Sequence, residues 1–145
     1  VSWGKLLSMS LRASFHCGAF ADHDVDKIIS STIAWLDDKS SADLIIIQWP
    51  ATVEDEEKIW QFHQELQDIP HLFFNCFYDF FVDPSVHRDW DNCFLEPYDT
   101  SSSYWHYLRD YGFRTYGQDQ YHYAVDAHQA WANVLINWIE KYHLL

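Results

Sequence analysis

The chain has 145 residues, with 22 Asp and Glu against 9 Lys and Arg, which gives a formal net charge of −13. This excess of acidic residues argues against direct binding to nucleic acid, because phosphate contacts need clustered Lys and Arg. A composition of 48% hydrophobic and 19% aromatic residues excludes intrinsic disorder. No apolar run approaches the roughly 18 residues of a membrane span, so we expect no membrane partner. At this length we expect one domain, residues 1–145, with a core of its own.

The cysteines indicate a reducing compartment. Cys17, Cys76 and Cys93 are odd in number and lack a CxxC spacing, so neither a disulfide framework nor a structural zinc site has its usual support. The first residues are not followed by the long apolar region of a secretory signal. We therefore expect buried free thiols, with one disulfide bridge as the alternative. We also expect a cytoplasmic location, and neither a cofactor nor a bound metal.

The first part of the chain alternates between strand-like and helix-like patterns. Residues 6–15 (LLSMSLRASF) alternate in a way that predicts a strand, with Leu7 and Met9 on one side. A helix is expected from Val25, after acidic residues that can cap its N-terminus, to about residue 36. Residues 43–49 (DLIIIQW) form a continuous aliphatic run, which is typical of a strand covered on both faces.

A second helix and a third strand follow. Thr52 and Asp55 have the spacing of a capping box, which predicts a helix as far as about Asp68. Its buried stripe should consist of Ile59, Phe62, Leu66 and Ile69. Residues 71–82 (HLFFNCFYDFFV) predict a further strand. The order β-α-β-α-β predicts an α/β fold, with a short, mainly parallel sheet and helices packed on it.

The second half of the chain is less regular. Residues 83–103 predict mainly loop, with one short strand near residues 93–95. Ser103 can cap a short helix that runs to Tyr111, with Gly112 as the residue that ends it. A long C-terminal helix is expected from about residue 119 to residue 142, with apolar residues on most of its circumference.

Several residue clusters contain side chains that could bind a metal or take part in catalysis. Residues 22–26 and 87–91 contain Asp and His, which can bind Zn, Mn or Fe, but neither segment has a recognised spacing such as HExxH. Capping of a helix explains the first cluster equally well. Cys17 follows the first expected strand, where a thiol could act as a nucleophile. No glycine-rich phosphate loop is present. We expect no catalytic residues, with a small Asp/His metal-dependent hydrolase or a thiol enzyme as the alternative.

The histidines near the C-terminus have simpler explanations than catalysis. His106 and Asp110, and likewise His122 and Asp126, are four residues apart on expected helices, which is the spacing of an ordinary surface pair. His128 lies among apolar positions, so we expect it to be a hydrogen-bonded core residue.

Two acidic and aromatic surfaces are the strongest functional signal. On the helix expected at residues 53–68, six acidic and amide side chains form an arc opposite the buried stripe, with Lys58 at its edge. Trp60 lies outside the buried stripe. A second surface is expected in residues 83–99. The candidate partner-binding residues are Glu54, Glu57, Trp60, Glu65 and Asp68 on the first surface, and Asp89, Trp90, Asp91, Glu96 and Asp99 on the second.

This pairing of carboxylates with large aromatic residues is typical of interface anchors. We therefore expect a non-enzymatic inhibitor that occludes a basic protein partner, most simply an immunity or antitoxin protein that neutralises a nuclease-type toxin. The composition is similar to that of bacterial toxin-immunity proteins and phage DNA mimics, and a DNA mimic that blocks restriction or defence enzymes is an alternative. The simplest alternative is a pair of solvated faces that keep the protein soluble.

Overall fold

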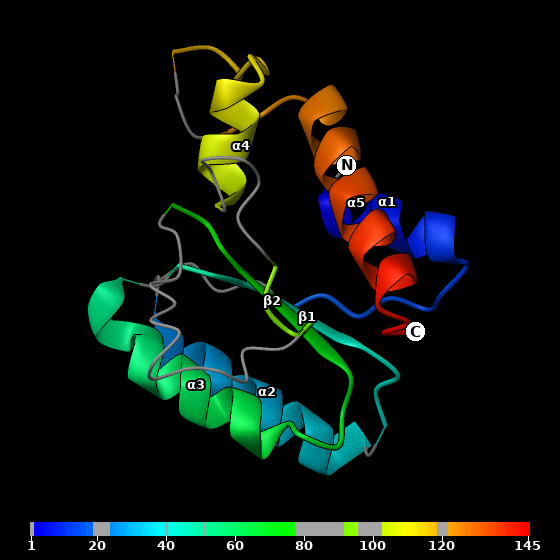
Figure 1. Ribbon diagram of the computed structural model, residues 1–145, viewed down its shortest axis with the longest axis vertical. Coiled ribbons are helices and arrows are strands. Elements are labelled where there is room, and N and C mark those ends of the chain that lie inside the picture. Colours follow the sequence, from blue (N-terminus) through cyan, green and yellow to red (C-terminus); the bar gives the residue numbers. More distant parts are fainter. Residues whose placement is uncertain are drawn as a thin grey trace.

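The computed structural model describes residues 2–18, 24–39, 41–50, 52–77, 92–95, 103–118 and 122–145. Helices lie on both sides of a small parallel sheet, as the sequence predicted for an α/β fold (Figure 1). The elements in chain order are α1 (Trp3–Leu11), α2 (Val25–Lys39), β1 (Ile45–Trp49), the 3₁₀ turn η1 (Val53–Asp55), α3 (Glu56–Glu65), β2 (His71–Asn75), α4 (Tyr104–Asp110) and α5 (Val125–Lys141).

The two strands pair in parallel, with Ile45 opposite His71 and Trp49 opposite Asn75. A parallel bridge joins Phe73 of β2 to Phe94. The Phe73 N–H donates to the Cys93 carbonyl oxygen at 2.7 Å, and the Leu95 N–H donates to the Phe73 carbonyl oxygen at 3.0 Å. Because Phe73 also pairs with β1, β2 has a parallel neighbour on each side. The strand expected near residues 93–95 is thus present as a single bridge.

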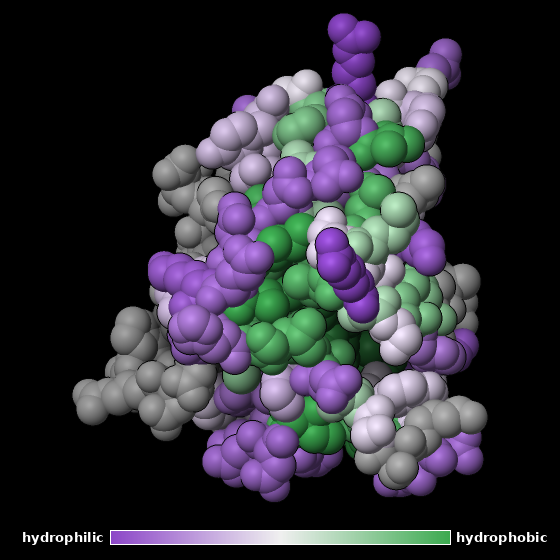
Figure 2. Space-filling view, turned by 90° about the vertical axis from the view of Figure 1, so that its right-hand side faces the viewer, coloured by the Kyte–Doolittle hydropathy of each residue, from purple (hydrophilic) through white to green (hydrophobic). Residues whose placement is uncertain are grey.

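Alternate side chains of β2 enter two separate cores. Phe73 packs with Phe94 and with the buried faces of α2 and α3, whereas Leu72 and Phe74 pack with α1, α4 and α5. In β1, Ile46 packs against the core formed with α1, α4 and α5, whereas Ile45 and Ile47 pack in the core under α3. The aliphatic run of β1 is therefore covered on both faces, as its sequence predicted. On the face seen from the right-hand side of Figure 1, hydrophobic residues occupy the middle, with hydrophilic residues around them (Figure 2).

The segment expected to be the first strand is instead helix α1, so the β-α-β-α-β order is wrong in its first element. Ser2 caps this helix by accepting a hydrogen bond from the Lys5 N–H. Leu7 is buried, but Met9 is 63% exposed, which contradicts the alternation that placed them on one side of a strand. Leu7 and Leu11 are four residues apart, so the same apolar positions also fit a helical stripe that packs against α5.

Several predicted boundaries are confirmed and others move. The Ser103 side chain accepts a hydrogen bond from the His106 N–H, and Gly112 has a positive φ of 76°, as expected at the two ends of α4. Strand β2 ends at Asn75, and residues 78–82 of the expected strand lie outside the described residues. Helix α5 begins at Val125, after Tyr123, which forms an antiparallel bridge with Thr115. Within the described residues, no helix combines the length and apolar character needed to cross a membrane.

Candidate functional site

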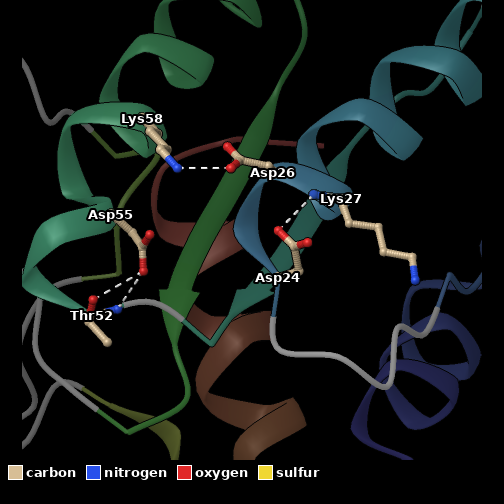
Figure 3. A network of polar contacts seen from close by, with 6 residues as sticks. All are labelled: Asp24, Asp26, Lys27, Thr52, Asp55 and Lys58. Carbon is tan, nitrogen blue, oxygen red and sulfur yellow. Dashed lines mark hydrogen bonds and ion pairs between the residues drawn. The ribbon is translucent and has the colours of Figure 1, made fainter.

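The helix that carries the first acidic surface begins as the sequence predicted. The Thr52 N–H donates to Asp55 Oδ2 at 2.9 Å, and the Thr52 hydroxyl lies 3.2 Å from the same oxygen (Figure 3). These contacts satisfy a backbone donor at the start of the helix. The first turn is the 3₁₀ turn η1, and α3 continues from Glu56. Residues 52–68 thus form one ordered unit that presents its side chains in fixed directions.

The buried stripe is confirmed for Ile59, Phe62 and Leu66, and it determines which side chains face solvent. Ile69 is only half-buried, because α3 ends at Glu65 and not near Asp68 as predicted. Ile59, Phe62 and Leu66 are between 0% and 3% exposed and pack against the sheet. The opposite side carries the carboxylates that the sequence predicted to be exposed, and all of them are. We call these four residues the acidic face: Glu54, Glu57, Glu65 and Asp68.

Lys58 is the only Lys or Arg in residues 52–68, and it does not lie among those carboxylates. Its Nζ lies 2.9 Å from Asp26 Oδ2 of α2 (Figure 3). The hydrogen bond and the charge of Asp26 raise the pKa of Lys58. The ion pair therefore joins α3 to α2, and the cation is directed toward α2.

The positions of the acidic residues along α3 have different energetic consequences. Glu54 and Glu57 lie near the N-terminus, where negative charge is favoured by the helix dipole. Glu65 ends the helix and Asp68 follows it, so both carboxylates lie near the C-terminus, where negative charge is disfavoured. Helix stability therefore explains the first pair but not the second.

The second predicted acidic surface comprises residues 83–99, of which the structure describes 92–95. Asp89, Trp90, Asp91, Glu96 and Asp99 all lie outside the described residues. The structure describes the five candidate partner-binding residues of the segment 54–68. Four of them lie on one exposed side of this segment. The fifth, Trp60, is half-buried, and its ring centroid lies 5.2 Å from that of His63.

Trp60 and Asp68 also line a pocket of about 420 Å³ at the C-terminal end of α3. Three side chains with metal-ligating atoms, His63, His71 and Cys93, line the same pocket. The three residues follow no known ligand spacing, so this grouping is not evident from the sequence. Their proximity arises only when α3 and the segment 92–95 pack beside β2.

Two described residues of the first acidic cluster considered as a metal site, Asp24 and Asp26, have structural roles. Asp24 Oδ1 accepts a hydrogen bond from the Lys27 N–H at 3.2 Å, so Asp24 caps α2, as the alternative explanation predicted (Figure 3). Asp26 forms the ion pair with Lys58. Asp22, His23 and residues 87–91 lie outside the described residues.

The thiols differ in their surroundings. Cys17 is exposed, and the neighbouring His16 stacks on Trp35 of α2 with ring centroids 5.2 Å apart. Cys76 is half-buried and accepts a hydrogen bond from Gln48 Nε2 at 3.2 Å. Burial raises the pKa of the Cys76 thiol, which reduces its thiolate fraction and hence its reactivity.

The histidines of α4 and α5 take part in local hydrogen bonds. His106 Nδ1 lies 2.7 Å from the Ser103 hydroxyl at the N-terminus of α4. His128 Nδ1 lies 3.3 Å from the hydroxyl of the buried Tyr104, and burial lowers the pKa of His128. His128 is hydrogen-bonded, as predicted, but it is half-buried and not a core residue.

Comparison with known proteins identifies no relative: no family model matches the chain, and no curated protein or solved structure is significantly similar to it.

Proposed function

We propose that this protein is a non-enzymatic, cytoplasmic inhibitor that binds a basic protein through the acidic face and occludes it. A nuclease-type toxin is the partner that this chemistry fits best, which makes the chain an immunity or antitoxin protein. The observation that carries the proposal is the exposure of four carboxylates on one side of α3 while Lys58, the only cation of that segment, is paired with Asp26.

The physical basis is charge complementarity. A nuclease holds the phosphates of its substrate with Lys and Arg, and carboxylates on a rigid helix can occupy the same positions. The net charge of −13 attracts a basic partner over a long range and accelerates encounter. The half-buried Trp60, beside the acidic face, can add apolar contact area. Buried aromatic contacts supply much of the affinity of such interfaces.

The position of Glu65 and Asp68 supports a role beyond solubility. Carboxylates kept only for solubility could lie anywhere on the surface, and at this end of α3 they oppose the helix dipole. A phage-type DNA mimic would use the same surface chemistry against restriction or defence enzymes. The Asp/His hydrolase is less well supported, because Asp24 and Asp26 are engaged in a helix cap and an ion pair.

The experiment uses the toxic product of a gene adjacent to the gene for this chain. Cells would express that product alone, with the wild-type chain, and with a triple variant of the acidic face, Glu57→Gln, Glu65→Gln and Asp68→Asn. We expect the wild type to restore growth and to bind the purified toxin in calorimetry. The triple variant should bind at least about tenfold more weakly, because three charged contacts are lost.

A matched control separates local contacts from net charge. The variant Asp43→Asn, Asp126→Asn and Glu140→Gln also changes the formal charge from −13 to −10, through exposed residues outside the segment 52–68. It should bind like the wild type within about twofold to threefold. Equal losses in both triple variants would contradict the acidic face as the contact surface. A restriction or defence enzyme as the bound and inhibited partner, with no toxin bound, would favour the DNA mimic.

A further inference from the structure

Three potential metal ligands come together from three separate segments. His63 lies in the last turn of α3, His71 is the first residue of β2, and Cys93 lies in the segment that pairs with β2. One ligand atom from each side chain lies within 4.8 Å of the other two. Imidazole nitrogen and thiolate sulfur are the donors that zinc sites in proteins use most.

The fold holds these side chains in place. The backbone hydrogen bonds of Phe73 fix the segment of Cys93 beside β2. The ring centroid of His63 lies 4.9 Å from that of His71 and 5.2 Å from that of Phe94. The packing that forms the core under α3 thus also arranges the three ligands, so binding requires little further ordering.

His71 is oriented as metal-binding histidines usually are. It is 2% exposed, and its Nδ1 lies 2.7 Å from the carbonyl oxygen of Ile69. Because a carbonyl only accepts, Nδ1 carries the hydrogen, and in the neutral ring Nε2 then carries a lone pair. Its Nε2 lone pair therefore faces His63 Nδ1, 2.7 Å away. A hydrogen bond from the second ring nitrogen to a backbone carbonyl fixes the ligand tautomer in many metal sites.

We propose that His63 Nδ1, His71 Nε2 and Cys93 Sγ bind one Zn²⁺ ion, with the fourth coordination position facing the pocket. Tetrahedral ligands at zinc distances lie about 3.3–3.6 Å apart, so the two imidazole nitrogens need to separate by about 0.6 Å. Cys93 Sγ lies within 4.8 Å of both nitrogens and needs to approach by up to about 1.2 Å. Binding replaces the His63–His71 hydrogen bond. The hydrogen on His63 Nδ1 moves to Nε2 by exchange with water, which leaves the ring neutral, and the proton of the Cys93 thiol is released to solvent. His143 lines the pocket as well, and either its side chain or water can occupy the fourth position.

Zinc in this position would connect α3, β2 and the segment 92–95. The ion would therefore stabilise the C-terminal end of α3, the helix that carries the acidic face. The proposed zinc site does not depend on the proposed inhibitor function. A metal that binds the folded chain more tightly than the unfolded chain raises the apparent stability. This gives the proposal a readout that needs neither a partner nor an activity.

The test uses the full chain after removal of metal with a chelator. Titration with Zn²⁺ against a chromophoric competitor should show one tight equivalent, and excess Zn²⁺ should raise Tm by at least about 5 °C. Co²⁺ should bind in its place and produce thiolate-to-cobalt charge-transfer absorption. The variant Cys93→Ser should lose this absorption and bind Zn²⁺ at least about 100-fold more weakly. Cys76→Ser, which changes another half-buried thiol next to β2, should behave as the wild type.

Circular dichroism of each metal-free variant establishes that it is folded before titration. His63→Gln provides a second ligand variant at a half-buried helix position, and it should also lose the tight equivalent. A wild-type chain without a tight equivalent, or a folded Cys93→Ser variant that retains thiolate-to-cobalt absorption, would overturn the proposal. Equal losses of affinity in Cys93→Ser and Cys76→Ser would do the same.

Discussion

The Nζ of Lys58 lies 2.9 Å from Asp26 Oδ2, so the only cation of the acidic helix is paired with the neighbouring helix α2. Residues 52–68 contain no other Lys or Arg that could compensate the carboxylates of the acidic face. In the variant Lys58→Gln, the surface around α3 becomes more negative by one charge. Association with a basic partner at 50 mM NaCl should therefore accelerate, by roughly twofold, in stopped-flow measurements.

Both partners of this ion pair are exposed, with 48% and 68% of their side-chain surface accessible, so its loss should change stability little. Thermal unfolding of Lys58→Gln and the wild type should nearly coincide. Slower association of the variant would show that Lys58 itself contacts the partner, which contradicts its assignment as a link to α2.

Association with the partner should depend strongly on ionic strength. The field of a −13 protein acts over distances that added ions screen beyond about 10 Å at 0.1 M salt. On-rates measured at 50 and 500 mM NaCl should differ by at least about tenfold. A difference of less than twofold would mean that the acidic face does not guide encounter.

The buried stripe of α3 should contribute much of the stability. Ile59 lies on the buried side of α3 and is 0% exposed. The variant Ile59→Ala should therefore lower the free energy of unfolding by about 2–4 kcal/mol in urea titrations. Ile33 of α2 offers a matched control, because it is 37% exposed. Ile33→Ala should cost less than about 1 kcal/mol. Similar losses at both positions would contradict the packing of α3 on the sheet.

Stability should fall as the pH is lowered below neutrality, in part because of His128. Burial lowers the pKa of His128 below the ordinary value of 6.5 that it has when unfolded. The unfolded chain therefore takes up this proton at a higher pH than the folded chain does, and its uptake favours unfolding. Urea titrations at pH 7.5 and 5.5 should show a smaller loss for His128→Gln than for the wild type. The exposed His122→Gln serves as control.

The cysteines should differ in their rates of alkylation in the native protein. Cys17 is exposed, whereas Cys76 is half-buried and burial raises the pKa of its thiol. Since the thiolate is the reactive form, Cys17 should react with iodoacetamide at least about tenfold faster at pH 7.5. Peptide mass mapping over time measures both rates. Faster reaction of Cys76 would place that thiol at the surface and contradict its packing against Gln48.

Local sequence signals were sufficient to predict structure where it depends on residues close together in the chain. Ser103 and Gly112 mark the ends of α4 because a side-chain acceptor and a positive φ are needed at those positions. The aliphatic run of β1 predicted a strand covered on both faces, and the spacing of Ile59, Phe62 and Leu66 predicted both the buried and the acidic side of α3. Each of these predictions depends on neighbours within a turn or two of the chain.

The tertiary structure decided what depends on distant neighbours. Apolar residues at positions 7 and 11 fit both a strand and a helix, and only packing against α5 selected the helix α1. The pairing of Lys58 with Asp26 required α2 and α3 to lie side by side. His63, His71 and Cys93 are separated by 8 and 22 residues in the sequence. The sequence by itself determined the α/β class and the acidic face, because short-range periodicity encodes them. Only the fold brought the three ligands together, because their proximity depends on contacts between distant segments.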